Sequence, residues 1–229
     1  MKQYRGWCFP DADEHLSSQV KADYPETYYQ QNILDAALSF VKKFDVAIDV
    51  GGNVGLHAVR LSKLFKSIHT FEPVSNNFEC LVKNTKDISN ITLYKNGLGN
   101  SKEIVEIQLP VNMEVNCGAY SIKKFTDLTE DKIIENISID RLDEYNLQPD
   151  FIKIDTEGFE LDVLEGACNT LEKHKPTIVA EVAKKKPTKK VLDFLKEFGY
   201  DLVWTANSDK VFTVLTDKQR KRLIKEGKI

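Results

Sequence analysis

The chain has 229 residues, of which 41% are hydrophobic, so its length and composition fit one sizeable hydrophobic core. Charged residues make up 29% of the sequence and the net charge is −3, so the overall charge favours neither nucleic acid nor an anionic membrane as a partner. The N-terminus shows no apolar run of signal-peptide length, and no stretch approaches the roughly 18 apolar residues of a membrane span. We therefore expect a single domain over residues 1–229, located in the cytoplasm.

The cysteines and histidines give no sign of a disulfide framework or a metal site. The cysteines lie far apart without a C-x-x-C pair, and the four histidines form no H-E-x-x-H motif or other ligand spacing. This pattern is typical of reduced thiols in a cytosolic protein. We predict no metal site, although metal dependence stays open. The cysteines are Cys8, Cys80, Cys117 and Cys168.

Residues 30–94 alternate between helical and extended patterns after an irregular start. Residues 1–29 are polar and aromatic without a clear period, and we expect an N-terminal arm or lid there. Apolar positions at helical spacing predict helices, and short β-branched apolar runs predict strands buried on both faces. In chain order these patterns predict a helix over 30–44, a strand over 46–50, a helix over 54–65, a strand over 67–71, a helix over 75–84 that Ser75 caps, and a strand over 91–94.

The segment 98–149 departs from this rhythm. EIVEIQL alternates as an antiparallel strand does, NCGAY indicates a turn, and ENISIDRLDEY begins as another strand. Because the segment is longer than a usual crossover, we expect an insertion-like excursion that covers a site or pairs at an edge. The regular pattern then resumes with strands over 151–154 and 177–182, helices over 160–173 and 188–198, two strands in YDLVWTA and KVFTVL, and a charged C-terminal helix.

Strands that alternate with helices predict an α/β fold with a doubly wound, mostly parallel sheet covered on both faces. The two neighbouring strands near the C-terminus are close enough to pair antiparallel, which gives a seven-stranded, Rossmann-like variant of this layout. Ligands of such sheets bind beyond the carboxyl ends of the strands. Each motif described below lies at such an end.

The stretch AIDVGGNVGLHAVRLS at 47–62 places a glycine-rich corner between a strand and a helix. A phosphate, a dinucleotide or a sulfonium cofactor could bind at such a corner. The spacing does not match the dinucleotide fingerprint G-x-G-x-x-G, which needs glycine at Asn53 and Leu56, and a P-loop would need a lysine at the helix start. Glycines instead allow a ligand to approach the backbone, and free N–H groups at the helix start can receive a carboxylate.

Two acids near this corner favour a cationic nucleoside ligand. Asp49 adds negative charge that a pyrophosphate would not favour and that suits a ligand with an ammonium and a sulfonium. Glu72 follows the next strand, 21 residues beyond Gly51 (72 − 51), and a carboxylate there can accept both hydroxyls of a ribose.

The sequence resembles the FkbM family of class I S-adenosylmethionine-dependent methyltransferases. The resemblance lies in DVGGNVG followed by FEP, in NISIDRLDEY, in FIKIDTEGFELDVLEGA and in PTIVAEV, and it covers about residues 46–182. It implies S-adenosylmethionine as the cofactor, with Glu72 at the ribose and Asn96 and Gly97 near the adenine. The residues implied at the methionine end are Asp49, Gly51, Gly52, Asn53 and Gly55.

A second acidic cluster follows the strand at 151–154. Asp155 should face the transferable methyl group and so counts among both the cofactor-binding and the catalytic candidates, while Glu181 ends the next strand beside it. Methyl transfer is an in-line displacement that needs an aligned, at least partly deprotonated acceptor oxygen. A carboxylate could act as the base, orient hydroxyl groups or hold a divalent ion. The catalytic candidates are Asp155, Glu157, Glu181 and His57; for Glu160 we favour an ordinary role at a helix N-terminus.

VAKKKPTKK places five lysines within 184–190, in what we expect to be a loop on the same face as the site. Such a run is most often solvated, and an anionic acceptor such as a nucleotide-sugar or phosphorylated glycan is the alternative hypothesis.

The family's known activities imply O-methylation of a hydroxyl on a sugar or another small-molecule or glycan acceptor. Methylation of a nucleic-acid base is an alternative, but the chain lacks the N-P-P-[YF] or D-P-P-[YF] segment of amino-group methylation and a basic, aromatic-rich patch. The missing G-x-G-x-x-G disfavours a nicotinamide-dependent oxidoreductase. A non-catalytic interaction module that binds S-adenosylmethionine remains a further hypothesis, and acceptor identity and oligomeric state stay open.

Overall fold

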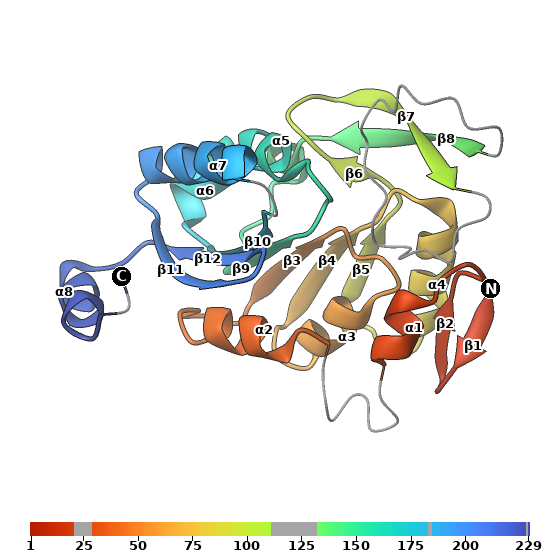
Figure 1. The fold of residues 1–229 in the computed structure, drawn as a ribbon, viewed down its shortest axis with the longest axis horizontal. Helices are drawn as coiled ribbons and strands as arrows, with labels where there is room; N and C mark the ends of the chain where they lie inside the picture. Colours follow the sequence, from red (N-terminus) through yellow and green to blue (C-terminus); the bar gives the residue numbers. More distant parts are fainter. Residues whose placement is uncertain (21–28, 111–131, 183–184, 228) are drawn as a thin grey trace.

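The computed structural model describes residues 1–20, 29–110, 132–182, 185–227 and 229, and the fold is given for these ranges. A seven-stranded sheet forms its centre, with the strand order β11-β12-β10-β9-β3-β4-β5 (Figure 1). All neighbouring pairs from β5 to β10 are parallel, and β12 is antiparallel to both β10 and β11. The prediction of a mostly parallel α/β sheet with an antiparallel terminal pair is therefore confirmed. The strands are β3 Val46–Val50, β4 Ser67–Phe71, β5 Ile91–Tyr94, β9 Phe151–Ile154, β10 Thr177–Glu181, β11 Asp201–Ala206 and β12 Asp209–Thr213.

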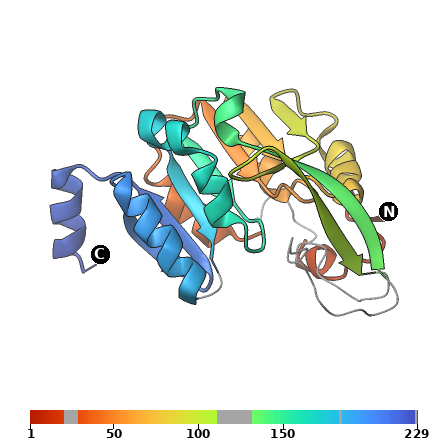
Figure 2. The ribbon, with the colours of Figure 1, turned by 90° about the horizontal axis from the view of Figure 1, so that it is seen from above.

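Helices cover both faces of this sheet (Figures 1 and 2). α2 (Gln31–Leu38) and α3 (Leu56–Ser62) lie on one face, and α5 (Glu160–Glu165), α6 (Cys168–His174) and α7 (Lys185–Glu197) lie on the other. Each face has its own core cluster, because the central strands are apolar on both sides: Ile48 packs with the α5–α7 cluster, and Ala47 packs with the α2–α3 cluster.

The excursion between the third and fourth predicted strands forms a second sheet of three strands. Its order is β6-β8-β7, with β6 at Gly97–Leu98, β7 at Glu103–Pro110 and β8 at Lys132–Asp140. β7 and β8 pair antiparallel from Glu103 opposite Ile139 to Pro110 opposite Lys132, as the alternating EIVEIQL pattern predicts. The predicted NCGAY turn and Cys117 lie outside the described residues. A 3-10 helix, η1 at Leu142–Tyr145, leads back to the main sheet.

The N-terminal segment contains regular elements that its composition did not indicate. β1 (Lys2–Tyr4) and β2 (Trp7–Phe9) form a hairpin, and α1 follows at His15–Gln19. The hairpin docks on α4 (Ser75–Thr85), where the Asn84 side chain accepts from the Cys8 amide and donates to the Cys8 carbonyl at 2.7 and 2.9 Å. Cys8 and Cys80 are both free thiols, and their sulfur atoms lie 3.4 Å apart.

Three predicted helices have different limits in the structure. The helix expected over 30–44 ends at Leu38, where i→i+3 bonds such as Phe40 N–H to the Ala37 carbonyl tighten the last turn. The helix expected over 54–65 spans Leu56–Ser62, because Gly55 is left-handed. The helix expected over 160–173 is two helices, α5 and α6, which meet at 166–167.

Two further expectations about helix starts were wrong. Ser75 does not cap α4: Val74 is the N-cap, and the Ser75 hydroxyl donates to Glu135 of β8. The lysine run does not form a loop, because α7 already begins at Lys185 and the run continues along its first turns.

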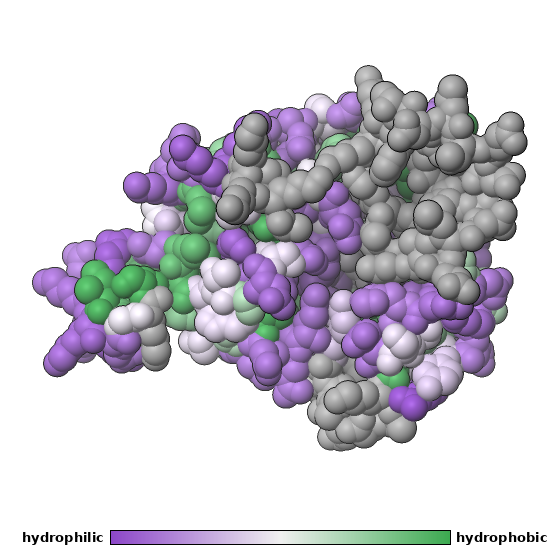
Figure 3. Space-filling view, viewed as in Figure 1, coloured by the Kyte–Doolittle hydropathy of each residue, from purple (hydrophilic) through white to green (hydrophobic). Residues whose placement is uncertain are grey.

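The described part of the face in Figure 3 is mainly hydrophilic, and apolar surface gathers over α8 (Asp217–Lys225) at the end farthest from the N-terminal hairpin. A capping box between Thr216 and Gln219 begins this C-terminal helix, which confirms the charged helix predicted there. No helix within the described ranges is long and apolar enough to cross a membrane.

Candidate active site

A cavity of about 240 Å³ lies where the carboxyl ends of β3, β4, β9 and β10 meet. The corner after β3 and the second sheet line it, together with Tyr29 and Gln30 from the N-terminal part of the chain. The predicted site residues that line it are Gly51, Gly52, Asn53, His57, Glu72, Gly97, Asp155, Glu157 and Glu181. Asp49, Gly55 and Asn96 are not among the lining residues.

The glycine corner is fixed by the protein's own backbone. The amides of Gly51 and Gly52 both donate to the Phe71 carbonyl at 3.0 Å, which ties the corner to the end of β4. Gly51 has a φ of +78°, and a Cβ there would overlap the carbonyl oxygen of Asp155. The residue must therefore be glycine so that the loop after β3 can pack against the loop after β9. Close approach of a ligand is not needed to explain it.

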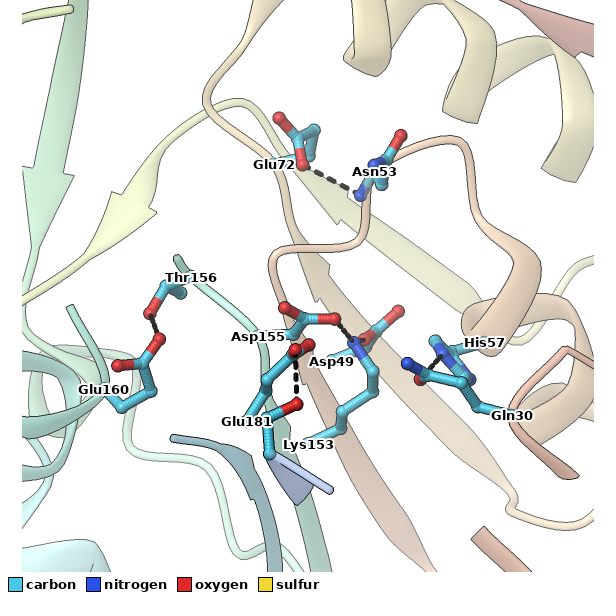
Figure 4. Close-up of polar contacts among 11 residues, drawn as sticks. Gln30, Asp49, Asn53, His57, Glu72, Lys153, Asp155, Thr156, Glu160 and Glu181 are labelled. Carbon is cyan, nitrogen blue, oxygen red and sulfur yellow. Dashed lines mark hydrogen bonds and ion pairs between the residues drawn. The ribbon is translucent and has the colours of Figure 1, made fainter. Parts of the chain in front are cut away.

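Glu72 is a buried carboxylate held from two sides. It accepts from the Asn53 amide at 2.8 Å (Figure 4) and from the Val74 amide at 2.9 Å. Burial raises the pKa of Glu72 to about 7, although these backbone bonds act in the opposite direction. Beside it, Asn53 adopts a left-handed φ of 49°, and its buried side-chain oxygen has no hydrogen-bond partner among the described residues. Within these residues, the corner therefore offers one polar atom that the protein leaves unsatisfied.

Asp49 lies behind the cavity wall, next to the positively charged side chain of Lys153. It is fully buried, and its carboxylate lies 3.7 Å from the Lys153 ammonium, which is an ion pair too long to count as a hydrogen bond. Burial raises the pKa of Asp49 to about 6, against the opposing effect of Lys153. The charge that we expected to face a cationic ligand is thus turned toward Lys153.

Asp155 and Glu181 form a carboxyl pair at the ends of β9 and β10. Asp155 accepts a hydrogen bond from the Lys153 ammonium at 3.2 Å (Figure 4). The Ser208 hydroxyl donates to Glu181 at 2.7 Å. Burial, followed by the charge of Asp155, raises the pKa of Glu181 to about 7. Glu181 can therefore hold or release a proton near neutral pH.

Glu157 and Glu160 differ in their surroundings. Glu157 has a left-handed φ of 54° and an exposed side chain at the cavity rim. Glu160 is buried and accepts from the Gly158 amide at 2.8 Å and from Thr156 at 3.1 Å (Figure 4). It holds the loop that precedes α5, in keeping with the helix N-terminal role favoured from sequence.

His57 lies on α3 and contacts the N-terminal segment. It forms a hydrogen bond of 3.0 Å with Gln30 (Figure 4). Its ring centre is 5.6 Å from that of Tyr29. Burial, with the positive charges of Lys153 and Arg60, lowers the pKa of His57 well below its usual value. The neutral ring therefore joins the wall that Tyr29 and Gln30 form.

Asn96 and Gly97 follow β5 as predicted, but only Gly97 reaches the cavity. The buried Asn96 side chain donates to the Gly97 carbonyl at 2.9 Å and so fixes the backbone at this edge of the cavity. Across the described ranges, no three His, Cys, Asp or Glu side chains are grouped as ligands of a metal ion.

Sequence reasoning missed Lys153, Tyr29 and Gln30. A signal for Lys153 was present, since a lysine inside the short apolar strand FIKI must be buried, and a buried lysine needs carboxylate partners. Tyr29 and Gln30 belong to a segment without periodicity, and no sequence signal placed them at the site.

The fold defines the structural class of the protein. A mostly parallel seven-stranded sheet with β12 inserted antiparallel between β10 and β11 is the Rossmann-like arrangement of solved methyltransferases. Solved structures share the fold. A methyltransferase FkbM from Methylobacillus flagellatus KT is 18% identical with a TM-score of 0.55, covering 74% of this chain and 43% of that one. A ribosomal protein L11 methylase from Lactobacillus delbrueckii subsp. bulgaricus is 13% identical with a TM-score of 0.53, covering 82% and 78%.

The model of the methyltransferase FkbM domain matches residues 49–202. The hexuronic acid methyltransferase AglP of Haloferax volcanii is 30% identical over 146 residues, which are 62% of this chain and 58% of that protein. The chain therefore belongs to the FkbM methyltransferase family.

Proposed function

We propose that this protein is an S-adenosylmethionine-dependent O-methyltransferase that acts on a hydroxyl group of a sugar or glycan. The observation that carries the proposal is the cavity that brings Asp155 and Glu181 together with Glu72. A carboxylate such as Glu181, with a pKa of about 7, suits the removal of a hydroxyl proton.

The residues of the corner fit the cofactor. Glu72 is fixed by two amides and lines the cavity, so it can accept the ribose hydroxyls. The Asn53 side-chain oxygen, which has no partner among the described residues, is available to a donor. The backbone of Gly51 and Gly52 would line the methionine end, and Gly97 would lie near the adenine. Bound S-adenosylmethionine supplies an electrophilic methyl group on a cationic sulfur.

The chain's own residues then position the acceptor and take up its proton. Asp155 and Glu181 accept a hydrogen bond from the acceptor hydroxyl and hold its oxygen toward the methyl group. Glu181 takes the hydroxyl proton, because its pKa of about 7 matches that task. Glu157 at the rim and the neutral His57 contact the acceptor, and Tyr29 with Gln30 closes the cavity on that side.

A sugar acceptor is supported by the relative that methylates a hexuronic acid and by the polar acids of the cavity. The same acids disfavour a polyanion such as nucleic acid. We further propose that residues 1–229 act as one methyltransferase domain, whose N-terminal segment and 98–149 excursion determine the acceptor. If the acceptor is anionic, Lys189 and Lys190 on α7 offer exposed positive charge that could bind it. Neutralising these two lysines tests the hypothesis of an anionic acceptor.

The proposal is tested by methyl transfer to a panel of glycans, free sugars and nucleotide-sugars. We expect transfer from S-adenosylmethionine to a hydroxyl of at least one of them. Glu181→Gln should lower kcat by roughly 100-fold or more, because it removes the proton acceptor. The matched control is Glu197→Gln, an exposed acid on α7 that should leave kcat unchanged. Cofactor binding without transfer to any acceptor would favour an interaction module.

A further inference from the structure

Cys8 and Cys80 bring two thiols together from distant parts of the chain. Cys8 lies in β2 of the N-terminal hairpin, and Cys80 lies in α4, 72 residues further along (80 − 8). The Cys8 thiol donates a hydrogen bond to the Cys80 sulfur, and the two sulfur atoms are 3.4 Å apart. Both side chains are buried free thiols. The methyl transfer proposed above uses neither of them.

The backbone around this thiol pair is held in place. Asn84 of α4 accepts from the Cys8 amide at 2.7 Å and donates to the Cys8 carbonyl at 2.9 Å. The Asn84 side chain also donates to the Val54 carbonyl of the glycine corner at 2.8 Å. These bonds fix β2 against α4, so the fold itself brings the two thiols together. A disulfide has a sulfur–sulfur distance of about 2.05 Å, so the two sulfurs, now 3.4 Å apart, need to approach by only about 1.4 Å.

We propose that Cys8 and Cys80 are a modification site, at which a peroxide oxidises the two thiols to a disulfide that ties the N-terminal hairpin to α4. The first thiol attacks a peroxide oxygen, the O–O bond breaks, and water leaves as a sulfenic acid forms. The second thiol attacks the sulfenic sulfur, the S–S bond forms, and a second water leaves. The two sulfurs lose two electrons to the peroxide oxygens, so two thiols and one hydrogen peroxide give one disulfide and two waters. A thiol reductant reverses the reaction.

The two thiols have different parts in this reaction. Cys8 lies on a terminal hairpin whose two strands pair only with each other among the described residues, so local opening exposes this thiol first. Cys80 is fully buried in α4, and burial raises the pKa of its thiol, which disfavours the reactive thiolate. The peroxide therefore oxidises Cys8, and Cys80 resolves the sulfenic acid once the hairpin closes and holds the two sulfurs together.

The disulfide would strengthen one wall of the cavity. A single apolar cluster contains Cys8, Leu16 of α1, Leu56 of α3 and Cys80. Leu16 and Leu56 also line the cavity. A covalent link between β2 and α4 therefore keeps α1 and the start of α3 in this packing, and it opposes local opening of the N-terminal hairpin.

Peptide mapping of the oxidised protein tests the site directly. Trypsin places the four cysteines on four separate peptides, with Cys8 on residues 6–21 and Cys80 on residues 67–83. After the folded wild-type protein is treated with equimolar hydrogen peroxide and its remaining thiols are blocked, we expect these two peptides to be joined. Dithiothreitol should separate them. The matched control is Cys168→Ser, which removes the half-buried thiol of α6 and should leave the link intact.

Oxidation should also change two properties of the folded protein. The Tm should rise by roughly 5–10 °C, because the disulfide restricts the unfolded chain. Amide hydrogen exchange in Lys2–Tyr4 and Trp7–Phe9 should slow by roughly tenfold or more. Neither change should occur in Cys8→Ala. The peptide map needs only the wild-type protein, so it decides the question even if this variant does not fold.

Three results would overturn the proposal. They are the absence of the linked peptide from the folded protein, a link that forms only after denaturation in urea, and pairing of Cys8 mainly with Cys117 or Cys168. The test measures no methyl transfer, so its outcome is independent of the proposed function.

Discussion

Gly51→Ala should destabilise the protein far more than an alanine at another glycine with the same backbone angle. Gly51 has a φ of +78°, and an added Cβ would overlap the Asp155 carbonyl oxygen and lie 3.0 Å from its carbonyl carbon. Gly199 has a φ of +81°, and nothing lies within 4 Å of its added Cβ. Alanine would therefore meet the same backbone strain at both sites, but it would clash with another loop only at Gly51.

The expected magnitudes follow from these two terms. A non-glycine residue in the left-handed region costs about 1–2 kcal/mol, and this is the full cost at Gly199. At Gly51 the carbonyl of Asp155 must also move, and forced packing of this kind costs about 1–3 kcal/mol more. Gly51→Ala should thus lower the free energy of unfolding by about 2–5 kcal/mol, against about 1–2 kcal/mol for Gly199→Ala.

Urea unfolding followed by circular dichroism measures both values under one set of conditions. Because the clash displaces Asp155, Gly51→Ala should also reduce methyl transfer under conditions where it is folded, and Gly199→Ala should not. Equal losses of stability in the two variants would refute the reasoning, since the close approach between the two loops would then have no energetic weight.

Three other outcomes are expected. Glu72→Gln should weaken S-adenosylhomocysteine binding roughly 10- to 100-fold in calorimetry, because it removes a charged hydrogen-bond acceptor, while the exposed Glu79→Gln should have no effect. Burial raises the pKa of Glu72 from 4.5 to about 7, so between these pH values the native state binds one proton more than the unfolded state. Protonation of Glu72 therefore stabilises the native state by about 3 kcal/mol at most. This stabilisation is fully present below pH 4.5 and is lost as the pH rises through 7. Unfolding measured from pH 4.5 to 7.5 should therefore show a shallower decline in Glu72→Gln than in the wild type, and parallel curves would count against a raised pKa. Replacing Lys189 and Lys190 by Gln should leave turnover of a neutral sugar unchanged, and a salt-dependent loss confined to anionic acceptors would identify the acceptor as anionic.

The main sheet was predictable because its strands are buried on both faces. FIKI and VAIDV read as short apolar runs, and glycines or acids end them at the point where the chain turns. Helix limits were less predictable. They depend on long-range contacts. At the junction of α5 and α6, for example, Gly166 packs so closely on Gly99 that an added Cβ would overlap the Gly99 carbonyl.

The cavity was predictable only in part. Acids that follow parallel strands must meet at one edge, so Asp155 and Glu181 could be placed together from sequence. The partner of Asp49 could not be predicted from sequence, because it depends on how β3 and β9 are aligned. Lys153 lies opposite Asp49 in this pair of strands but is 104 residues away in the sequence (153 − 49). Tyr29 and Gln30 reach the cavity through tertiary docking of a segment with no periodic pattern.

We expect the corner between β3 and α3, together with Glu72, to bind S-adenosylmethionine. Calorimetric titration of the wild-type protein with S-adenosylmethionine, with NAD as the comparison ligand, measures this binding. The titration should give one bound S-adenosylmethionine per chain and no binding of NAD. Binding of NAD without binding of S-adenosylmethionine would show that the corner is not a site for this cofactor.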